Sequence, residues 1–548
     1  MNADKIIHNG TIFTLEDDGP ETVEAVAIAG NKIIAVGSKD EVLQHKTDST
    51  ELVDLKGAFA LPGLIDPHIH HAIAGAFWFL TTIRADEDWG LPGVKNVQVF
   101  DHDTYLQRLK AADAALADQN EWLIAYGYAS YYHGKIGRDD LERISSARPI
   151  VLFQRSGHEL FMNGKAMELT GFTEENTKDD PQIDFAHGHF IEEGVIEKAL
   201  PLLMPIMLKG DNWAKALKLS LDYLHRNGIT TVADMLGMDG FNDQQRMVFK
   251  QIIDAPDVPL RTFMVTEPRM VFQKQGPEAA VAFTDSLSKN DGPNLKYLKQ
   301  IKLYADGAFF AQLMRIKGGY TDGHQGEWIT PPDLLKQMMA TYWNKNYGIH
   351  IHVNGDEGVD VLLSICQSLR EANPKSNSRI VFHHLGYTQP EQIERMKKLG
   401  IYASLLPYYI HALGDIYSKV GFTPENAERI SASGICAKYK VPFSLHSDFP
   451  MSPSQPLYNA WCAVNRIGVL SGKELGAEEK ISVRDAIRAV TIEAARTINK
   501  EDELGSIKVG KHADFTILAE NPFEVDPIKL KDIKVTAKVF DGKYLSLQ

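Results

Sequence analysis

Short apolar segments alternate with helical segments through the middle of this 548-residue chain, and this alternation limits the possible folds more than any other feature. Helical segments such as PPDLLKQMMATYWNKN separate runs rich in β-branched residues, which is the arrangement expected of βα units and a parallel sheet. The strand-like segments lie at 64–70, 228–234, 260–266, 300–306, 348–354, 379–385, 400–406 and 441–448. Eight such strands predict an α/β fold of the (β/α)8 TIM-barrel type, with a doubly wound open sheet as the alternative.

The two ends of the chain have a different character. Residues 5–60 contain short β-type runs with hairpin turns predicted at Asn9-Gly10 and Gly30-Asn31, so we expect a small antiparallel sheet. The C-terminal residues are again β-rich and punctuated by turns. We therefore predict one β-sandwich domain built from both termini, and we divide the chain accordingly. The sandwich comprises residues 1–60 plus 495–548, and the TIM barrel comprises residues 61–494.

Residues 84–215 are too many for a single loop between a barrel strand and its helix. They contain a strand-like run, PIVLFQRSGH, helix-like segments around 103–119 and 139–146, and the Gly/His-rich piece AHGHFIEEG. Long ordered excursions from a barrel normally lie at its active-site end. We predict that residues 84–215 form an inserted lid subdomain over the barrel mouth.

Composition excludes several classes of partner. The net charge is −14 and Lys and Arg form no dense cluster, which argues against nucleic acid or an anionic membrane as a partner. Three widely spaced cysteines indicate neither a disulfide framework nor a thiolate metal site. Such low cysteine usage is consistent with the reducing environment of the cytoplasm. The apolar run Ala72–Leu80 is far shorter than the ~20 residues that span a bilayer. We expect a cytoplasmic protein with a small-molecule substrate, and a homo-oligomer stays open.

Histidines and other polar residues gather where the predicted strands end. In LPGLIDPHIHH (61–71), strand alternation places Asp66, His68 and His70 on one face. Paired imidazoles begin a metal site, although such a pair alone is weak evidence. Later strand ends supply Lys302, His350, His352, His383, His384, His446 and Asp448. Charged groups at the ends of apolar strands are rarely buried unless they are paired or bind metal. Together they predict a metal centre.

This order of residues resembles the metal-dependent amidohydrolase superfamily. IKLYADGA, HVNGDEG and SDFP are similar to the branch that contains N-substituted formamide deformylases and YtcJ-like hydrolases. The resemblance implies two divalent metal ions, bridged by a hydroxide and by an N6-carboxylated Lys302. It implies the metal ligands His68, His70, Lys302, His352, His384 and Asp448. This ligand set suits zinc, and also manganese, iron or nickel, with zinc as the first expectation. An unmodified Lys302 paired with an acid such as Asp306, beside a single metal, is the alternative.

Two choices between neighbouring histidines follow from position. His352 is preferred to His350 because it lies nearer the strand end and matches the family's His-x-x-Gly-Asp. His383 and His384 should point to opposite faces of a strand, so only one should face inward. The family's Glu-His pattern places His384 at the ligand position and His383 at the Glu.

Several further residues are candidates for contact with the substrate or with the metal ligands. Candidate substrate contacts are His158, Phe309, Tyr408 and His446, and simple packing is the alternative for each. Asp66 is a candidate for orienting His68 or His70. The aromatic residues that follow several strand ends suggest an apolar pocket.

We predict that the protein hydrolyses an amide-type C–N bond in an N-acyl or N-formyl compound, with an apolar or aromatic group in the substrate. Asp448 would act as the catalytic base and then as the acid. One alternative is a one-metal aminohydrolase or deaminase of a ring amidine, which would need one metal and no carbamate. Another is a non-catalytic scaffold with this fold, against which the complete ligand set argues.

Overall fold

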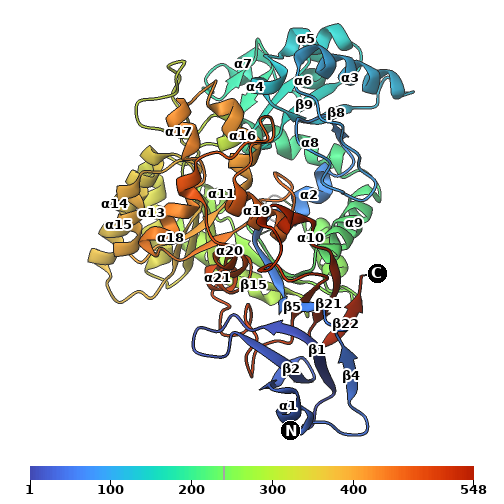
Figure 1. The fold of residues 1–548 in the computed structure, drawn as a ribbon. Coiled ribbons are helices and arrows are strands. Elements are labelled where there is room, and N and C mark those ends of the chain that lie inside the picture. Colours follow the sequence, from blue (N-terminus) through green and yellow to red (C-terminus); the bar gives the residue numbers. More distant parts are fainter. Residues whose placement is uncertain (238–240, 548) are drawn as a thin grey trace.

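The computed structural model describes residues 1–237 and 241–547, and its centre is an eight-stranded parallel sheet (Figure 1). The strands follow one another around the sheet in chain order from β6 to β19. They are β6 (Leu64–Ile69), β13 (Ile229–Asp234), β14 (Arg261–Thr266), β15 (Leu295–Tyr304), β16 (Gly348–Val353), β17 (Ile380–His384), β18 (Tyr402–Leu405) and β19 (Phe443–Leu445).

The two edges of this sheet meet. Beyond β19, Phe449 forms a parallel bridge with Ile69 of β6. The Asp448 N–H donates to the His68 carbonyl at 3.0 Å, and the His70 N–H donates to the Phe449 carbonyl at 2.8 Å. The sheet is therefore a nearly closed barrel, which confirms the predicted TIM-type fold over the open-sheet alternative.

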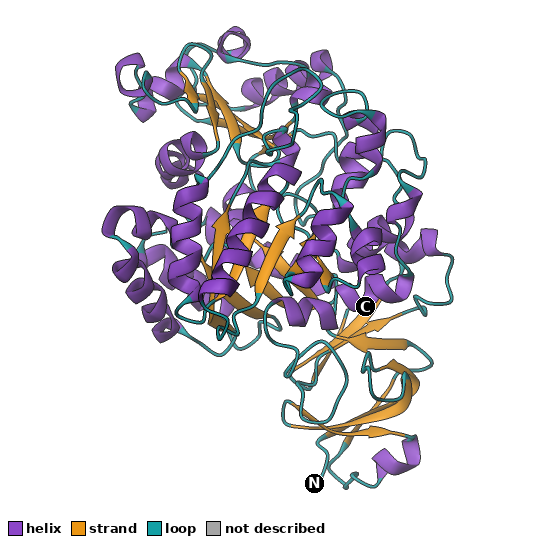
Figure 2. Ribbon diagram, turned by 90° about the vertical axis from the view of Figure 1, so that its left-hand side faces the viewer, coloured by secondary structure: helices purple, strands orange, loops and turns teal. Residues whose placement is uncertain are grey.

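Helices surround the barrel, as Figure 2 shows. They include α9 (Asn212–Arg226), α10 (Asp243–Ile253), α13 (Pro332–Trp343), α14 (Asp356–Ala372), α15 (Pro390–Lys398) and α18 (Ser433–Tyr439). Both α13 and α15 begin at a proline, whose missing N–H costs nothing in the first turn. Three basic residues in the last turn of α15 complement the negative end of its dipole. No helix within the described ranges is long and apolar enough to cross a membrane.

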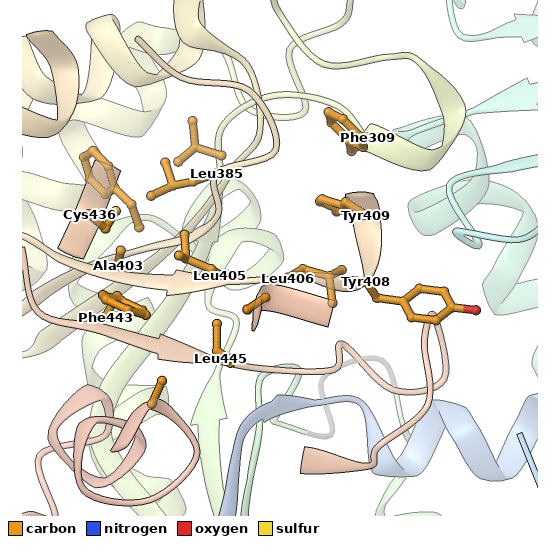
Figure 3. Packing of buried hydrophobic residues seen from close by; sticks show 14 of the residues in the cluster. Phe309, Leu385, Ala403, Leu405, Leu406, Tyr408, Tyr409, Cys436, Phe443 and Leu445 are labelled. Carbon is orange, nitrogen blue, oxygen red and sulfur yellow. The ribbon is translucent and has the colours of Figure 1, made fainter. Parts of the chain in front are cut away.

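Strand alternation separates the apolar layer outside the barrel from its polar interior. On β18, Ala403 and Leu405 lie in the apolar cluster that also holds Phe443, Leu445 and Cys436 (Figure 3). Ser404, between them, instead hydrogen-bonds inside the barrel to His446. The period of two thus directs alternate residues of one strand to packing and to the site.

Strands from the two ends of the chain form one further sheet, here called the terminal sheet, in the order β22-β21-β20-β5-β1-β2-β3 with β4 beside β1. Its strands are β1 (Lys5–Phe13), β2 (Thr22–Ala29), β3 (Lys32–Gly37), β4 (Glu51–Asp54), β5 (Phe59–Pro62), β20 (Phe515–Leu518), β21 (Val535–Phe540) and β22 (Lys543–Ser546). The predicted sandwich and its boundaries at residues 60 and 495 remain predictions.

Two expectations for the N-terminal strands are wrong. The N-terminal part of the sheet is mixed rather than antiparallel, because β1 pairs in parallel with β4 and β5. Asn9-Gly10 is not a hairpin turn but an irregularity within β1, where Asn9 has a φ of 59°. A Cβ at Gly10 would lie 2.4 Å from the Ala58 carbonyl oxygen, so close backbone approach explains this glycine. The turn at Gly30-Asn31 between β2 and β3 is confirmed.

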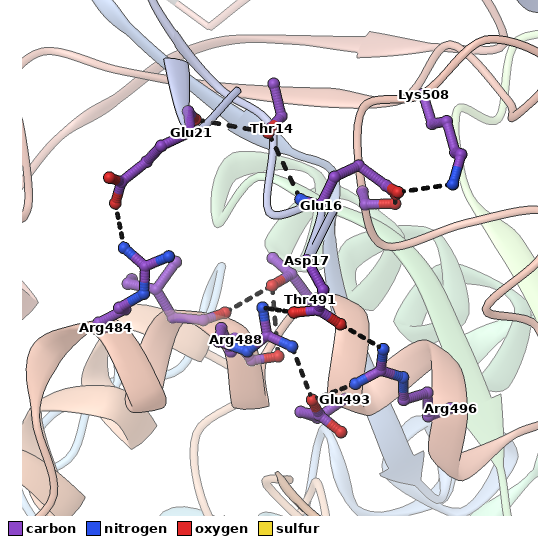
Figure 4. A network of polar contacts seen from close by, with 12 residues as sticks. Thr14, Glu16, Asp17, Glu21, Arg484, Arg488, Thr491, Glu493, Arg496 and Lys508 are labelled. Atoms are coloured by element: carbon purple, nitrogen blue, oxygen red, sulfur yellow. Dashed lines mark hydrogen bonds and ion pairs between the residues drawn. The ribbon is translucent and has the colours of Figure 1, made fainter. Parts of the chain in front are cut away.

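A charged network joins the terminal sheet to the barrel (Figure 4). Asp17 pairs with Arg488 and with Arg496, each at 3.0 Å. Glu16 pairs with Lys508 at 2.8 Å. The loop after β1 is thus tied through Asp17 to α20 (Val483–Ala489) and α21 (Ile492–Thr497), and through Glu16 to the segment that precedes β20.

The insertion between β6 and β13 has a sheet of its own, in the order β11-β12-β10-β9-β8-β7. Its strands are β7 (Thr81–Thr82), β8 (Leu123–Tyr128), β9 (Ile150–Gln154), β10 (Glu159–Met162), β11 (Ile183–Asp184) and β12 (His189–Ile191). The Gln154 side-chain amide donates to the Phe310 carbonyl at 2.6 Å, and the Tyr126 hydroxyl lies 3.1 Å from the Pro450 carbonyl. The insertion therefore contacts loops that follow barrel strands β15 and β19.

Candidate metal centre

Asp448 lies at the centre of a buried cluster at the carboxyl ends of the barrel strands. Its Oδ1 atom is 3.1 Å from His70 Nε2 and 3.3 Å from His68 Nε2, and its Oδ2 atom is 3.9 Å from His384 Nδ1. Lys302 Nζ is 3.3 Å from His68 Nε2. Residues from the first, fourth, sixth and eighth strand regions thus meet at one point.

Two groups of side chains in this cluster can hold a metal ion. One group is His68, His70 and Asp448, and the other is His68, His384 and His446, with the ligand atoms of each group within 4.8 Å of one another. Burial lowers the pKa of His68 and His384 well below the ordinary value, and lowers that of His446 to about 3. Neutral imidazoles keep a lone pair for a metal, so the donor set fits divalent ions.

The histidine contacts differ from the predicted ligand set at two positions, His352 and His446. His352 belongs to neither three-residue group, and its Nε2 atom lies 3.0 Å from the Asn354 side-chain amide. Its ring nevertheless lies beside that of His384, with 4.5 Å between centroids. His446, predicted as a contact of the substrate or of the metal ligands, is a candidate donor by geometry.

Lys302 is fully buried on β15, and burial lowers the pKa of its ammonium to about 7. Its alternative partner, Asp306, is occupied elsewhere. The two oxygens of Asp306 accept from the backbone N–H groups of Asn354, Gly355 and Arg315 at 2.8–3.0 Å. The structure thus gives no support to a simple Lys302–Asp306 pair.

The expectation that only one of His383 and His384 faces inward is wrong. His383 lies 2.9 Å from His68 Nδ1, and His384 lies 3.2 Å from His446 Nε2, so both rings are inside the barrel. The cause is backbone geometry, because His384 ends β17 with a φ of 73° and leaves the alternating strand conformation.

Asp66 Oδ1 accepts from the His68 backbone N–H at 3.4 Å, and Asp66 makes no hydrogen bond or ion pair with the imidazole of His68 or His70. Its carboxylate accepts from the hydroxyls of Ser447 and Ser454 at 2.5 and 2.6 Å. Burial raises its pKa to about 6. Asp66 therefore fixes the loop after β19. Asp234, which the sequence reading missed, accepts from the His71 N–H at 2.8 Å and fixes the chain after His70.

His158 reaches the cluster from the insertion. Its ring stacks on that of His352 with 5.8 Å between centroids, and its Nδ1 atom lies 2.7 Å from a Glu192 carboxylate oxygen. The other Glu192 oxygen accepts from the Ala308 N–H at 3.0 Å. Glu192, which joins the insertion to the barrel, was missed as a site residue, although it lies in the Gly/His-rich piece AHGHFIEEG.

The structure places Phe309 and Tyr408 in packed surroundings. Phe309 stacks on Tyr409 with 4.4 Å between centroids, and both Phe309 and Tyr408 are fully buried. The Tyr408 hydroxyl lies 3.0 Å from Asp86 Oδ1, which also pairs with Arg155 at 2.7 Å. The ring of Tyr409 lies 6.4 Å from that of His384. A substrate contact by Phe309 or Tyr408 stays a prediction.

Comparison with known proteins gives consistent results. A family model described as "Amidohydrolase family" matches residues 51–545. The chain is 24% identical to "Putative amidohydrolase YtcJ" of Bacillus subtilis (strain 168), over 98% of both chains. It is 22% identical to N-substituted formamide deformylase of Arthrobacter pascens, over 98% of this chain and 97% of the relative. An uncharacterized metal-dependent hydrolase from Pyrococcus horikoshii OT3 shares the fold, with a TM-score of 0.71 and 20% identity over 95% of this chain and 99% of that chain.

Proposed function

We propose a reaction for this chain from the premise that it belongs to the amidohydrolase family and is a metal-dependent hydrolase acting on carbon–nitrogen bonds. The proposed substrate is an N-acyl or N-formyl compound with an amide-type bond that is not a peptide bond. The observation that carries this proposal is the convergence of His68, His70, Lys302, His384 and Asp448 at the carboxyl end of the barrel. Similarity to an N-substituted formamide deformylase supports the N-formyl class.

The proposed ligands divide between two divalent ions, with zinc as the proposed metal. His68, His70 and Asp448 would hold one ion, His352 and His384 would hold the other, and His446 is an additional candidate donor. When bound, such ions polarise a carbonyl group and lower the pKa of a water molecule.

Lys302 would serve the centre as a carbamate. A lysine whose pKa burial lowers to about 7 is largely neutral just above that pH, and only the neutral amine is nucleophilic. Its nitrogen forms a bond to the carbon of CO₂ and loses a proton to solvent. The product carries two oxygen donors and a negative charge at a place where an unmodified ammonium would repel the ions.

Asp448 is the proposed catalytic residue. Its carboxylate lies beside His68 and His70, so it can accept a proton from the attacking water and then donate that proton to the leaving nitrogen. The backbone hydrogen bond from the Asp448 N–H to the His68 carbonyl holds it in position. Ester hydrolysis would use the same groups.

The proposed substrate pocket lies between the barrel mouth and the insertion, which we propose acts as a lid. His158 from the insertion stacks on His352, while Tyr304 and Tyr409 present rings 5.5 Å from His352 and 6.4 Å from His384. These aromatic surfaces favour an apolar or aromatic group on the substrate.

Metal counting combined with native intact-mass measurement tests the proposal. We expect two metal ions per chain and a mass increase corresponding to one CO₂, lost in the Lys302→Met variant. A screen of N-formyl and N-acyl amines should then identify a substrate, with the chelated protein as control. One ion without the CO₂ adduct would favour the aminohydrolase alternative, and a protein that binds no metal would contradict the proposal.

A further inference from the structure

A chain of hydrogen bonds crosses the interior of the barrel below the metal centre. It begins at Gln300 on β15, whose Oε1 atom is 2.9 Å from His350 Nε2. His350 Nδ1 is 2.8 Å from His383 Nε2, and His383 Nδ1 is 2.9 Å from His68 Nδ1. The four side chains come from β15, β16, β17 and β6, and each is at most 3% exposed. Both ring nitrogens of His350 and of His383 are used within this chain.

Gln300 lies at the far end of the barrel from the metal centre. It pairs with Gly348, the first residue of β16, and it lines a cavity of about 320 Å³ together with Gly348, Arg379 and Ile498. The chain of side chains therefore runs from the floor of the barrel to the metal ligand His68. His350 and His383 were left without a role by the predicted ligand set.

The orientation of the Gln300 amide is fixed by its second contact. Its Nε2 group donates to the Ile498 carbonyl at 2.9 Å. A backbone carbonyl can only accept a hydrogen bond, so the amide NH₂ must face Ile498 and the amide oxygen must face His350. The acceptor at the start of the chain is thus determined by chemistry.

The direction of the remaining hydrogen bonds follows if each ring carries one proton. Neither His350 nor His383 has an ion pair within residues 1–237 and 241–547, and a buried unpaired imidazolium would be costly. His350 then donates its Nε2–H to Gln300 and accepts at Nδ1 from His383 Nε2–H. His383 accepts at Nδ1 from His68 Nδ1–H. His68 is left with a lone pair on Nε2, the atom that faces Lys302 and Asp448.

We propose that Gln300, His350 and His383 are positioning residues that hold His68 in its Nδ1–H tautomer, so that Nε2 is the metal-binding atom. This inference rests on the proposed function, because it requires a metal at His68. Metal-binding histidines usually donate the second ring N–H to a carboxylate or to a backbone carbonyl. Here the Gln300 amide at the barrel floor fixes the direction of the hydrogen bonds. The neutral imidazoles of His350 and His383 connect that amide to His68.

The other ligand histidine with an imidazole partner is linked to hydroxyl groups instead of to an amide. His384 Nδ1 lies 3.2 Å from His446 Nε2, and His446 Nδ1 lies 2.9 Å from the Ser404 hydroxyl. The Ser404 hydroxyl contacts Ser444 at 3.0 Å, Ser444 contacts Thr497 Oγ1 at 2.8 Å, and Thr497 Oγ1 donates to the Glu493 carbonyl at 3.0 Å. An amide reaches His68 through two imidazoles, whereas hydroxyls reach His384 through one, so Gln300 is the residue that tests the longer chain.

Zinc affinity of the purified protein, measured by equilibrium dialysis with zinc alone, provides a readout that needs no substrate. Loss of the direct partner in His383→Phe should weaken zinc binding by about 10- to 100-fold. Gln300→Met removes the fixed acceptor and should weaken binding less, by about 3- to 10-fold. Gln300→Lys places a donor beside His350 and reverses the chain, so it should weaken binding more than Gln300→Met does.

Comparing a double variant with its single variants distinguishes the proposed positioning role of Gln300 from a general effect on folding. Because Gln300 acts through His383, the His383→Phe/Gln300→Met variant should bind zinc no more weakly than His383→Phe alone. Gln392→Met is the matched control, since Gln392 is a buried glutamine that donates to the Asp356 carbonyl outside this chain, and it should leave zinc affinity unchanged. If Gln300→Met does not fold, His350→Phe replaces it in the same cycle.

Additive losses in the double variant, or equal losses in Gln300→Met and Gln300→Lys, would overturn the inference while leaving the proposed function intact. A wild-type protein that binds no zinc or other divalent ion would overturn both.

Discussion

Lys302 in the barrel and Lys538 in the terminal sheet are both fully buried, and burial lowers the pKa of each to about 7. Their surroundings differ. Lys538 donates to the Ile229 backbone carbonyl at 2.8 Å, an ordinary acceptor that fixes the side chain between the terminal sheet and the barrel. Lys302 instead has His68 Nε2 at 3.3 Å. Each lysine also has one carboxylate whose charge acts on it, Asp448 for Lys302 and Asp514 for Lys538.

Burial therefore lowers the pKa of both lysines, but the two side chains have different roles. In the terminal sheet it accompanies a satisfied hydrogen bond, and the residue contributes to how two parts of the chain pack. In the barrel it leaves an amine among potential metal ligands, where a lowered pKa favours reaction. A perturbed pKa alone does not identify a functional lysine, and the contacts around it decide.

The largest effect should come from removing the carboxylate at the barrel centre. Asp448→Asn should lower kcat by about 10²- to 10⁴-fold, because an amide cannot transfer the proton. Steady-state kinetics on the identified amide, with metal content measured in parallel, checks this. Asp514→Asn is the matched control beside the terminal sheet, where Asp514 pairs with Arg261 at 2.6 Å, and it should lower stability while kcat is unchanged. Near-normal turnover by metal-loaded Asp448→Asn would rule out the assignment.

Matched substitutions of the two lysines test the comparison directly. Lys302→Met should lose a metal ion and lower kcat/KM by about a hundredfold, which corresponds to a few kcal/mol of lost stabilisation of the transition state. Lys538→Met should retain both ions and full activity. Elemental analysis of the two purified variants provides the measurement. Equal metal loss in both would show that the contrast between the two regions is wrong.

Lys538 should also make stability depend on pH. Its pKa is about 7 in the folded protein, whereas a lysine in the unfolded chain titrates near 10.5. Between these values the unfolded chain binds the extra proton, so the free energy of unfolding rises with pH by at most about 1.4 kcal/mol per pH unit. Below about pH 7 both states are protonated and this slope disappears. Thermal unfolding of wild type and Lys538→Met at pH 7, 8 and 9 should show a difference that grows with pH. A difference that does not change with pH would contradict the prediction.

The smallest effect is expected at the charged network between the terminal sheet and the barrel. Arg496 pairs with Asp17 at 3.0 Å and with Glu493 at 2.6 Å, and its side chain is 29% exposed. Arg496→Ala should lower the free energy of unfolding by about 1 kcal/mol or less, since partly exposed ion pairs contribute little. Metal content and kcat should not change. A large loss of activity would show that this junction influences the barrel centre.

Much of the barrel could be predicted because its signal is local. The strand containing IHIHV alternates apolar residues with His350 and His352, and β16 has both histidines inside the barrel as that period requires. Asn9-Gly10 shows where local signals fail. The same two residues that favour a hairpin also fit an irregular strand, and the nearby Ala58 backbone decides between them.

The site was predicted in part for a similar reason. Strand order brings the carboxyl ends of parallel strands together, so His68, Lys302 and Asp448 could be expected to meet. The conformation of His384 could not, because a φ of 73° at the end of a strand depends on the loop that follows. Nor could the contact of Glu192 with His158, which requires the insertion to fold back on the barrel.

The sequence by itself determined the number and order of the barrel strands, the chemical types of the candidate ligands and the strand ends that carry them. These depend on residue type and on the period of a strand, which are properties of short segments. Only the tertiary structure decided which atoms approach one another. It turned His383 and His384 to the same interior, gave Lys538 a carbonyl partner that Lys302 lacks, and linked Gln300 to His68 through two imidazoles. Such contacts depend on distances between residues far apart in the chain, and closure of the barrel sets those distances.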